Sequence, residues 1–90
     1  MNQTNKYQTF EEVRDYVLNI EIGTSIIDKS KDIDTAFRRT SEELFHIQGF
    51  LWAFALTNVI TSEQQNNLHL EVLGILNNKR RDVIRGFQNE

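Results

Sequence analysis

The chain contains no cysteine and no proline among its 90 residues. Without cysteine it can form neither disulfides nor thiolate metal sites, and the four scattered glycines leave no segment with the composition of a linker. Residues 1–6 are polar and lack the apolar centre of a signal peptide. The longest uninterrupted apolar run, residues 50–56, is far shorter than the roughly 20 residues that span a bilayer. We therefore expect a single helical domain over 1–90, in the cytoplasm, with no membrane span.

Charge of one sign is also in short supply, since the formal net charge is only −3. Residues 1–45 hold nine acids and six bases, and residues 46–90 hold four of each. Nucleic-acid binding usually requires a basic face, because phosphate contacts dominate its affinity. The candidate anion contacts are Lys79, Arg80, Arg81 and Arg85. The dipole of a helix also favours cations near its C-terminus, and we prefer that explanation, so a nucleic-acid partner is not expected.

The apolar run at residues 50–56 predicts the centre of the core. A helix that is apolar on nearly every side must be buried on more than one side. We therefore expect Trp52 to be buried, so that Trp52→Ala would cost roughly 3–5 kcal/mol as a core truncation. Two long helices and one short helix would still leave apolar surface uncovered, which points to a homodimer.

Capping signals predict where the first and last helices begin. Thr9 with Glu12 three residues later is a capping box that opens a helix over about 9–22, after eight frayed residues, and Gly23 would end it. Asn58 tolerates the left-handed conformation and would end the middle helix. A second box, Thr61 to Gln64, opens a helix over about 62–87. The short connection between these two helices predicts an antiparallel hairpin, with the first helix packed across it.

The middle helix is harder to delimit. Its apolar seam has a spacing of four and three, interrupted at Ser30 and Thr40, and supports one helix over about 26–58 or one that begins near Asp32. The string from Thr40 to Glu43 is itself a capping box, and a break there would give four helices. The seam keeps its phase across Thr40, which favours continuity. The predicted fold class is all-α: a three-helix bundle, or a four-helix bundle with the break, built on a long antiparallel helical hairpin.

Small residues at a spacing of four indicate a shallow groove on the middle helix. This groove would be formed by Gly49, Ala53 and Thr57, with Phe50 beside it. Three interpretations are open: close approach of a neighbouring helix in the same chain, which we favour, a homodimer contact, or a groove for a side chain of another protein. With Trp52, these residues form the candidate partner or dimer surface.

Catalytic and metal-binding patterns are missing. His46 and His69 are 23 residues apart on different predicted helices, about 7–8 Å out of level along the hairpin axis, so a shared metal is not expected. No serine lies in a Gly-x-Ser-x-Gly turn, and no Gly-rich phosphate loop occurs. The acids at Asp28, Asp32 and Asp34 lack the glycine and the glutamate of a calcium loop. We expect no enzyme, no catalytic residue, no metal and no cofactor.

Two families share features with the chain. The string from Gly49 to Leu73 resembles the hairpin of small accessory proteins of Gram-positive phages and mobile elements, a group that includes inhibitors of host defence systems. That resemblance covers about a quarter of the chain and supplies no functional residues. The chain is also similar to the helical-bundle immunity proteins against pediocin-like bacteriocins in its length, lack of cysteine and late helix opened by Thr61 to Gln64. Members of that family tend to be basic four-helix bundles, whereas this chain is acidic.

The leading hypothesis is a non-enzymatic accessory protein of a phage or mobile element that binds another protein, for example to inhibit a host defence protein. It is motivated by the excess of apolar surface and the lack of catalytic patterns. The alternative is a bacteriocin immunity protein. A third reading is a small DNA-binding regulator that uses the C-terminal basic cluster.

Overall fold

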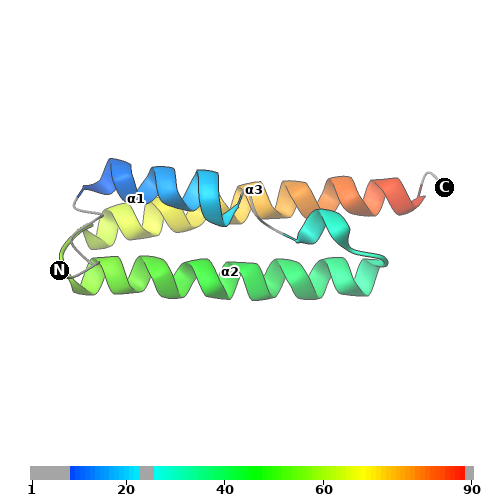
Figure 1. Cartoon of the computed structure of the whole chain (residues 1–90), viewed down its shortest axis with the longest axis horizontal. Helices are drawn as coiled ribbons and strands as arrows, with labels where there is room; N and C mark the ends of the chain where they lie inside the picture. Colours follow the sequence, from blue (N-terminus) through cyan, green and yellow to red (C-terminus); the bar gives the residue numbers. More distant parts are fainter. Residues whose placement is uncertain (1–8, 23–25, 89–90) are drawn as a thin grey trace.

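The computed structural model describes residues 9–22 and 26–88, and these ranges are helical apart from short connections (Figure 1). Helix α1 spans Phe10–Tyr16 and continues as a π-helical turn, η2, over Val17–Glu21. A short 3-10 helix, η3, spans Ile27–Lys29, α2 spans Ile33–Leu56 and α3 spans Ser62–Gln88. The predicted all-α fold class is confirmed for the described residues, with three α-helices.

The first helix begins where the capping box predicts. The backbone N–H of Glu12 donates to the Thr9 hydroxyl at 3.2 Å, and that hydroxyl donates to the Glu12 carboxylate at 3.1 Å. Val13 and Val17, one turn apart, are fully buried. The predicted helix over 9–22 corresponds to α1 with η2. The predicted stop at Gly23 and the frayed residues 1–8 lie outside the described residues.

The middle helix begins at Ile33 with Asp32 as its N-cap, which agrees with the predicted start near Asp32 and not with a start at residue 26. The Asp32 carboxylate accepts the Thr35 backbone N–H at 2.7 Å, which caps α2, and Ser30 is extended between η3 and that cap. No break occurs at Thr40. Its buried hydroxyl donates to the Ala36 carbonyl at 2.7 Å, so it is satisfied within α2 and does not cap a new helix. The four-helix alternative therefore loses the break on which it depended.

The connection between α2 and α3 forms as the sequence predicts. Asn58 has a φ of 64°, its N–H donates to the Ala55 carbonyl at 3.1 Å, and the Val59 N–H donates to the Phe54 carbonyl at 2.9 Å. This is a Schellman motif with asparagine in the left-handed position. The Thr61 and Gln64 side chains then each accept the other residue's backbone N–H, at 3.0 and 2.9 Å. Two consecutive end signals thus turn the chain back on itself within a few residues.

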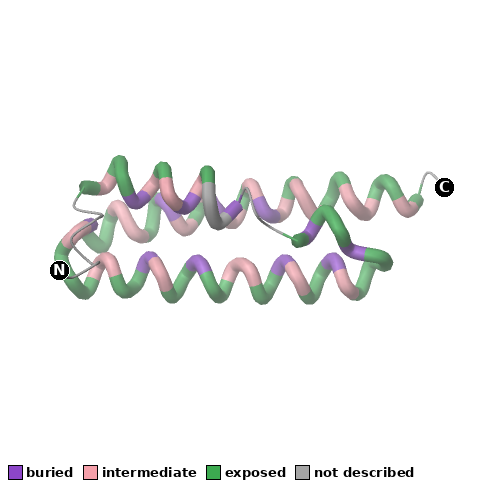
Figure 2. Tube along the Cα trace, viewed as in Figure 1, coloured by how far each residue is buried: buried purple, intermediate pink, exposed green. Residues whose placement is uncertain are grey.

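The core lies where α2, α3 and the first helical segment face one another (Figures 1 and 2). Its buried apolar members are Val13, Val17, Ile22, Ile27, Ile47, Leu51, Ile60, Leu68, Val72 and Leu76. Two ion pairs tie the other elements to α3. Arg14 on α1 binds Glu71 through two hydrogen bonds of 2.7 and 3.1 Å, which raise the pKa of Arg14, and Lys79 pairs with Asp28 on η3 at 3.0 Å.

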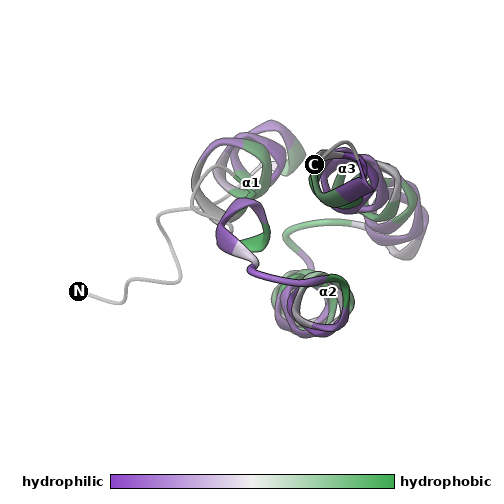
Figure 3. Cartoon of the chain, turned by 90° about the vertical axis from the view of Figure 1, so that its right-hand side faces the viewer, coloured by the Kyte–Doolittle hydropathy of each residue, from purple (hydrophilic) through white to green (hydrophobic). Residues whose placement is uncertain are grey.

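The expectation that Trp52 is buried is wrong for the single chain. Trp52 is 61% exposed, and Phe45 and Leu56 are 73% and 64% exposed. The arc of α2 that meets its neighbours carries Ile47 and Leu51 instead. The physical reason is that α1 packs on one side of the α2–α3 hairpin, and no helix among the described residues lies on the other side (Figure 3).

Candidate functional site

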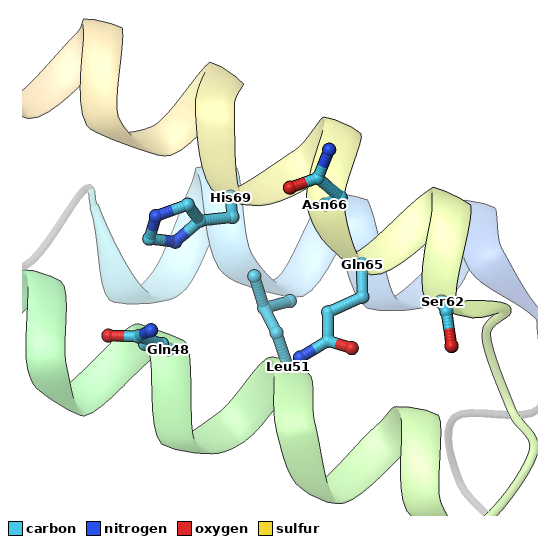
Figure 4. A pocket seen from close by; sticks show the side chains of 6 residues that line it. All are labelled: Gln48, Leu51, Ser62, Gln65, Asn66 and His69. Carbon is cyan, nitrogen blue, oxygen red and sulfur yellow. The ribbon is translucent and has the colours of Figure 1, made fainter.

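The side of the hairpin away from α1 is the candidate site. On the α1 side, the Tyr16 ring lies 5.4 Å from the Phe50 ring, centroid to centroid, and Arg14 binds Glu71. Two positions along an α-helix turn through about 200°, so Trp52 points nearly opposite to Phe50. The close view in Figure 4 shows the hairpin from this second side, with α1 behind it.

Two shallow cavities adjoin on this side of the hairpin. One, of about 320 Å³, is lined by Phe45, Gln48, Gly49, Trp52 and Gln65. The other, of about 240 Å³, is lined by Gln48, Leu51, Ser62, Gln65, Asn66 and His69 (Figure 4). Gln48 and Gln65 line both, so the two cavities are neighbours. We call the residues that line them the open face.

Gly49 forms a notch in the open face. A Cβ atom built on Gly49 would meet no atom within 4 Å. Among the described residues, close approach of another element therefore does not explain the glycine, which corrects the interpretation that the sequence favours. Glycine inside an exposed helix costs about 1 kcal/mol relative to alanine. Phe45 and Trp52 stand on either side of the notch, four residues before Gly49 and three after it.

The open face carries no formal charge. Residues 44–62 contain no Asp, Glu, Lys or Arg, and Glu63 is the only such residue between Leu44 and Leu70. The polar groups of the face are the amides of Gln48, Gln65 and Asn66, the Ser62 hydroxyl and the His69 imidazole. Amides and hydroxyls both donate and accept hydrogen bonds. The face can therefore bind an apolar surface that is surrounded by either donors or acceptors.

The histidines do not come together in the hairpin. His46 packs edge-on against the Phe50 ring at 5.5 Å, on the α1 side, whereas His69 lines the open face. Among the described residues, no group of three or more His, Asp or Glu side chains is placed to hold a metal ion.

The five residues of the predicted partner surface do not share one side of α2. Gly49 and Trp52 line the open face. Phe50 is half-buried toward α1, with the Phe54 ring 6.0 Å away. Ala53 is exposed, and Thr57 is the C-cap whose hydroxyl donates to the Ala53 carbonyl at 3.0 Å.

Phe45 is a member of the open face that the sequence analysis does not include in the candidate surface. The available signal was its spacing of seven residues from Trp52 with Gly49 between them.

The basic cluster is divided between two sides of α3. The Lys79 ammonium pairs with Asp28 on η3. The Arg80 guanidinium lies over the Phe37 ring, 4.4 Å from its centroid, and Arg81 donates to Asn78. Arg80, Arg81 and Arg85 line a shallow cavity of about 450 Å³ with Phe37, Asn77, Ile84 and Gln88. Of the four predicted anion contacts, only the three arginines share a surface.

Two further findings bear on the class of the protein. In the described ranges, no helix combines the length and the apolar content needed to cross a bilayer. Comparison of the chain with protein-family models, with curated proteins and with solved structures finds no match.

Proposed function

We propose that the chain is a non-enzymatic, protein-binding three-helix bundle that packs the open face against a helix of another polypeptide. The observation that carries this proposal is the exposure of Phe45, Trp52 and Leu56, each more than 60% exposed within a stretch that has no charge. Leu56 follows Trp52 by one helical turn and extends the apolar surface beyond the cavities. A contiguous exposed apolar patch of a few hundred Å² is often a functional surface in a soluble protein.

The size of the patch indicates what the partner must supply. Aromatic side chains offer about 150–250 Å² each, so at these exposures Phe45, Trp52 and Leu56 together present roughly 400 Å². Covering that area stabilises a complex by roughly 10 kcal/mol at about 25 cal/mol/Å². Association itself costs about 4–15 kcal/mol. A partner that only covers these side chains would thus bind weakly, and we expect it to contribute apolar groups of its own, as an amphipathic helix does.

The biological setting follows from the resemblances and remains a hypothesis about this chain. We favour an accessory protein of a phage or mobile element that acts by binding, and inhibiting, a host protein. The bacteriocin-immunity alternative relied in part on a four-helix arrangement, and the continuous α2 removes that argument.

A small DNA-binding regulator is the third candidate, and one observation favours it: Arg80, Arg81 and Arg85 line one cavity together with an aromatic ring. It predicts a mobility shift of duplex DNA at low salt that is lost in the variant with all three arginines changed to glutamine. An absence of any shift at low salt would remove this candidate.

Photo-crosslinking tests the leading proposal. A benzoylphenylalanine at Phe45 keeps an aromatic group on the open face, and the same group at Asp82, exposed on α3, serves as the matched control. We expect the probe at Phe45, in the cells that express the protein, to crosslink to a polypeptide, whether a foreign protein or a second copy, and the probe at Asp82 not to do so. Equal labelling at both positions, or none at Phe45, would reject the open face as a protein-binding surface.

A further inference from the structure

We propose that the polypeptide that covers the open face is a second copy of this chain, with α2 antiparallel to α2 of the partner copy across a two-fold axis beside Gly49. This inference rests on the proposed function and names its partner. It follows from the charge of the open face, from the register of its side chains and from the area that it exposes.

The open face lacks charged groups that would repel their own copies at a two-fold axis. In a symmetric dimer the same patch faces itself, so a charged group near the axis meets its own copy. The open face has no formal charge, and neither does any other position from 44 to 62. Its amides, Gln48, Gln65 and Asn66, can each donate to and accept from their own copies. A face steered to a foreign partner by electrostatics would instead carry charge complementary to that partner.

The spacing of Phe45, Gly49 and Trp52 along α2 suits an antiparallel pair of these helices. A two-fold axis between Gln48 and Gly49 places Phe45 of each copy opposite Trp52 of the other. Both aromatic pairs then lie about 5 Å on either side of the axis, because each ring is three or four residues from it. Gly49 lies at the point of closest approach, where the missing Cβ lets the two backbones come together. The space beside Gly49, which no described element of one chain fills, would be filled by the backbone of the second copy.

The area that the open face can bury limits the strength of the dimer. Standard interfaces bury about 800 Å² on each partner. Phe45, Trp52 and Leu56 supply roughly half of that, so a dimer interface of standard size must also bury the neighbouring amides and Ala53. The dimer should therefore be reversible, with a dissociation constant on the order of 1–100 µM.

Cysteine crosslinking tests the register, and the chain is suited to it because it contains no cysteine. Mixing Phe45→Cys chains with Trp52→Cys chains under a thiol oxidant such as diamide should give a disulfide-linked dimer. That dimer keeps one native Phe45–Trp52 pair. Either variant alone should crosslink at least tenfold less. Two copies of one position would lie about 10 Å apart along the length of α2, which is beyond the reach of a disulfide. Phe45→Cys mixed with Asp82→Cys is the control and should not crosslink.

Charge substitution gives a second, independent test. Phe45→Lys and Trp52→Glu should each lower the dimer fraction in sedimentation equilibrium at 100 µM. The equimolar mixture should recover it, because the lysine introduced at position 45 of one chain would face the glutamate introduced at position 52 of the other. Both sites are exposed, so circular dichroism should show unchanged helicity. If the two single variants dimerise like the unmodified chain, or if their mixture shows no recovery, the proposed register is wrong.

The outcome for the unmodified chain separates this inference from the proposed function. A monomer at 100 µM would overturn self-association. If the photo-probe at Phe45 then still captures a foreign protein, the protein-binding function stands and only its partner has been misassigned. If it captures nothing, both proposals fall.

Discussion

The two ends of the helical hairpin use side chains of opposite character. The end that contains the α2–α3 turn, residues 44–70, carries one charged residue, Glu63. At the other end, charged groups link the elements: Lys79 on α3 pairs with Asp28 on η3, and Arg39 on α2 donates to the Ile26 carbonyl at 3.1 Å, while Arg38 lies 3.8 Å from Glu42 within α2. The same two helices therefore present a neutral apolar end and a charged end held by side-chain contacts.

Exposed aromatic rings at the two ends of the hairpin have different neighbours. Phe37, at the charged end, is partly exposed, but the Arg80 guanidinium lies over its ring. The quadrupole of the ring attracts a cation placed in this way, so the exposed ring already has a charged group of the same chain over its face. Trp52, at the neutral end, has no charged residue in its own stretch from 44 to 62. The charged end is suited to contact with water, and the neutral end is suited to contact with another helix.

The largest expected effect is on the free energy of unfolding, and it contrasts a buried residue of the neutral end with its exposed neighbour. Leu51 is fully buried and Trp52, the next residue, is largely exposed. We expect Leu51→Ala to lower the free energy of unfolding by about 2–5 kcal/mol through loss of packing. Trp52→Ala should lower it by less than about 1 kcal/mol when measured well below the dimer dissociation constant. Urea denaturation followed by circular dichroism measures both, and equal losses would mean that Trp52 belongs to the core after all.

The next effect is at the turn that closes the neutral end. Asn58 holds a φ of 64°, a conformation in which β-branched side chains are strained. We expect Asn58→Val to cost about 1–2 kcal/mol, while Asn58→Gly should be nearly neutral or stabilising because glycine adopts this conformation freely. Thermal unfolding of the pair measures the difference. A valine variant as stable as the glycine variant would show that the turn does not require the left-handed residue.

A smaller effect distinguishes a glycine of the open face from one outside it. A Cβ at Gly49 or at Gly74 would meet no atom within 4 Å, and both residues are exposed in long helices. Alanine at either site should therefore stabilise the monomer by about 1 kcal/mol. Only Gly49→Ala should also weaken dimerisation, because only Gly49 lies at the proposed axis. If both alanine variants dimerise equally well, the notch plays no part in association.

The sequence predicts the helix ends better than the side of a helix that is buried. Thr9, Asn58 and Thr61 act locally, through side chains and backbone groups within a few residues, so their roles follow from the sequence alone. The buried arc of α2 depends on which side of the hairpin α1 packs against. That choice is made by tertiary packing, and a stretch that is apolar on nearly every side does not reveal which arc stays uncovered.

The candidate site shows the same division. The sequence predicts Gly49 and Trp52 on a common surface, and the structure brings them together with Phe45 and Gln65. Gln65 comes from the next helix, so its place beside Trp52 depends on the hairpin register and not on local spacing. The sequence predicts Phe50 beside the small residues of this surface, but Phe50 packs against Tyr16.

The smallest expected effect is a dependence on pH at the charged end. Hydrogen bonds from the Thr35 side chain and backbone N–H lower the pKa of the Asp32 carboxyl at the start of α2. The fold thus favours the ionised carboxylate, and this contribution to stability is present above the unfolded-state pKa of about 4. It is lost as the pH falls through the lower folded-state pKa. Asp32→Asn keeps an oxygen acceptor at the cap but does not titrate.

A comparison of Asp32→Asn with the unmodified chain isolates this contribution from the other carboxylates. The urea midpoint of the unmodified chain should fall relative to that of the variant as the pH is lowered from 5 to 3, and the difference should stay constant from pH 5 to 7. Because Asp32 is exposed, added salt should reduce the effect. Gly49→Ala, which changes the neutral end, should shift the midpoint by the same amount at every pH. A pH-dependent shift for Gly49→Ala, or none for Asp32→Asn, would show that the two ends are not as distinct as their charges indicate.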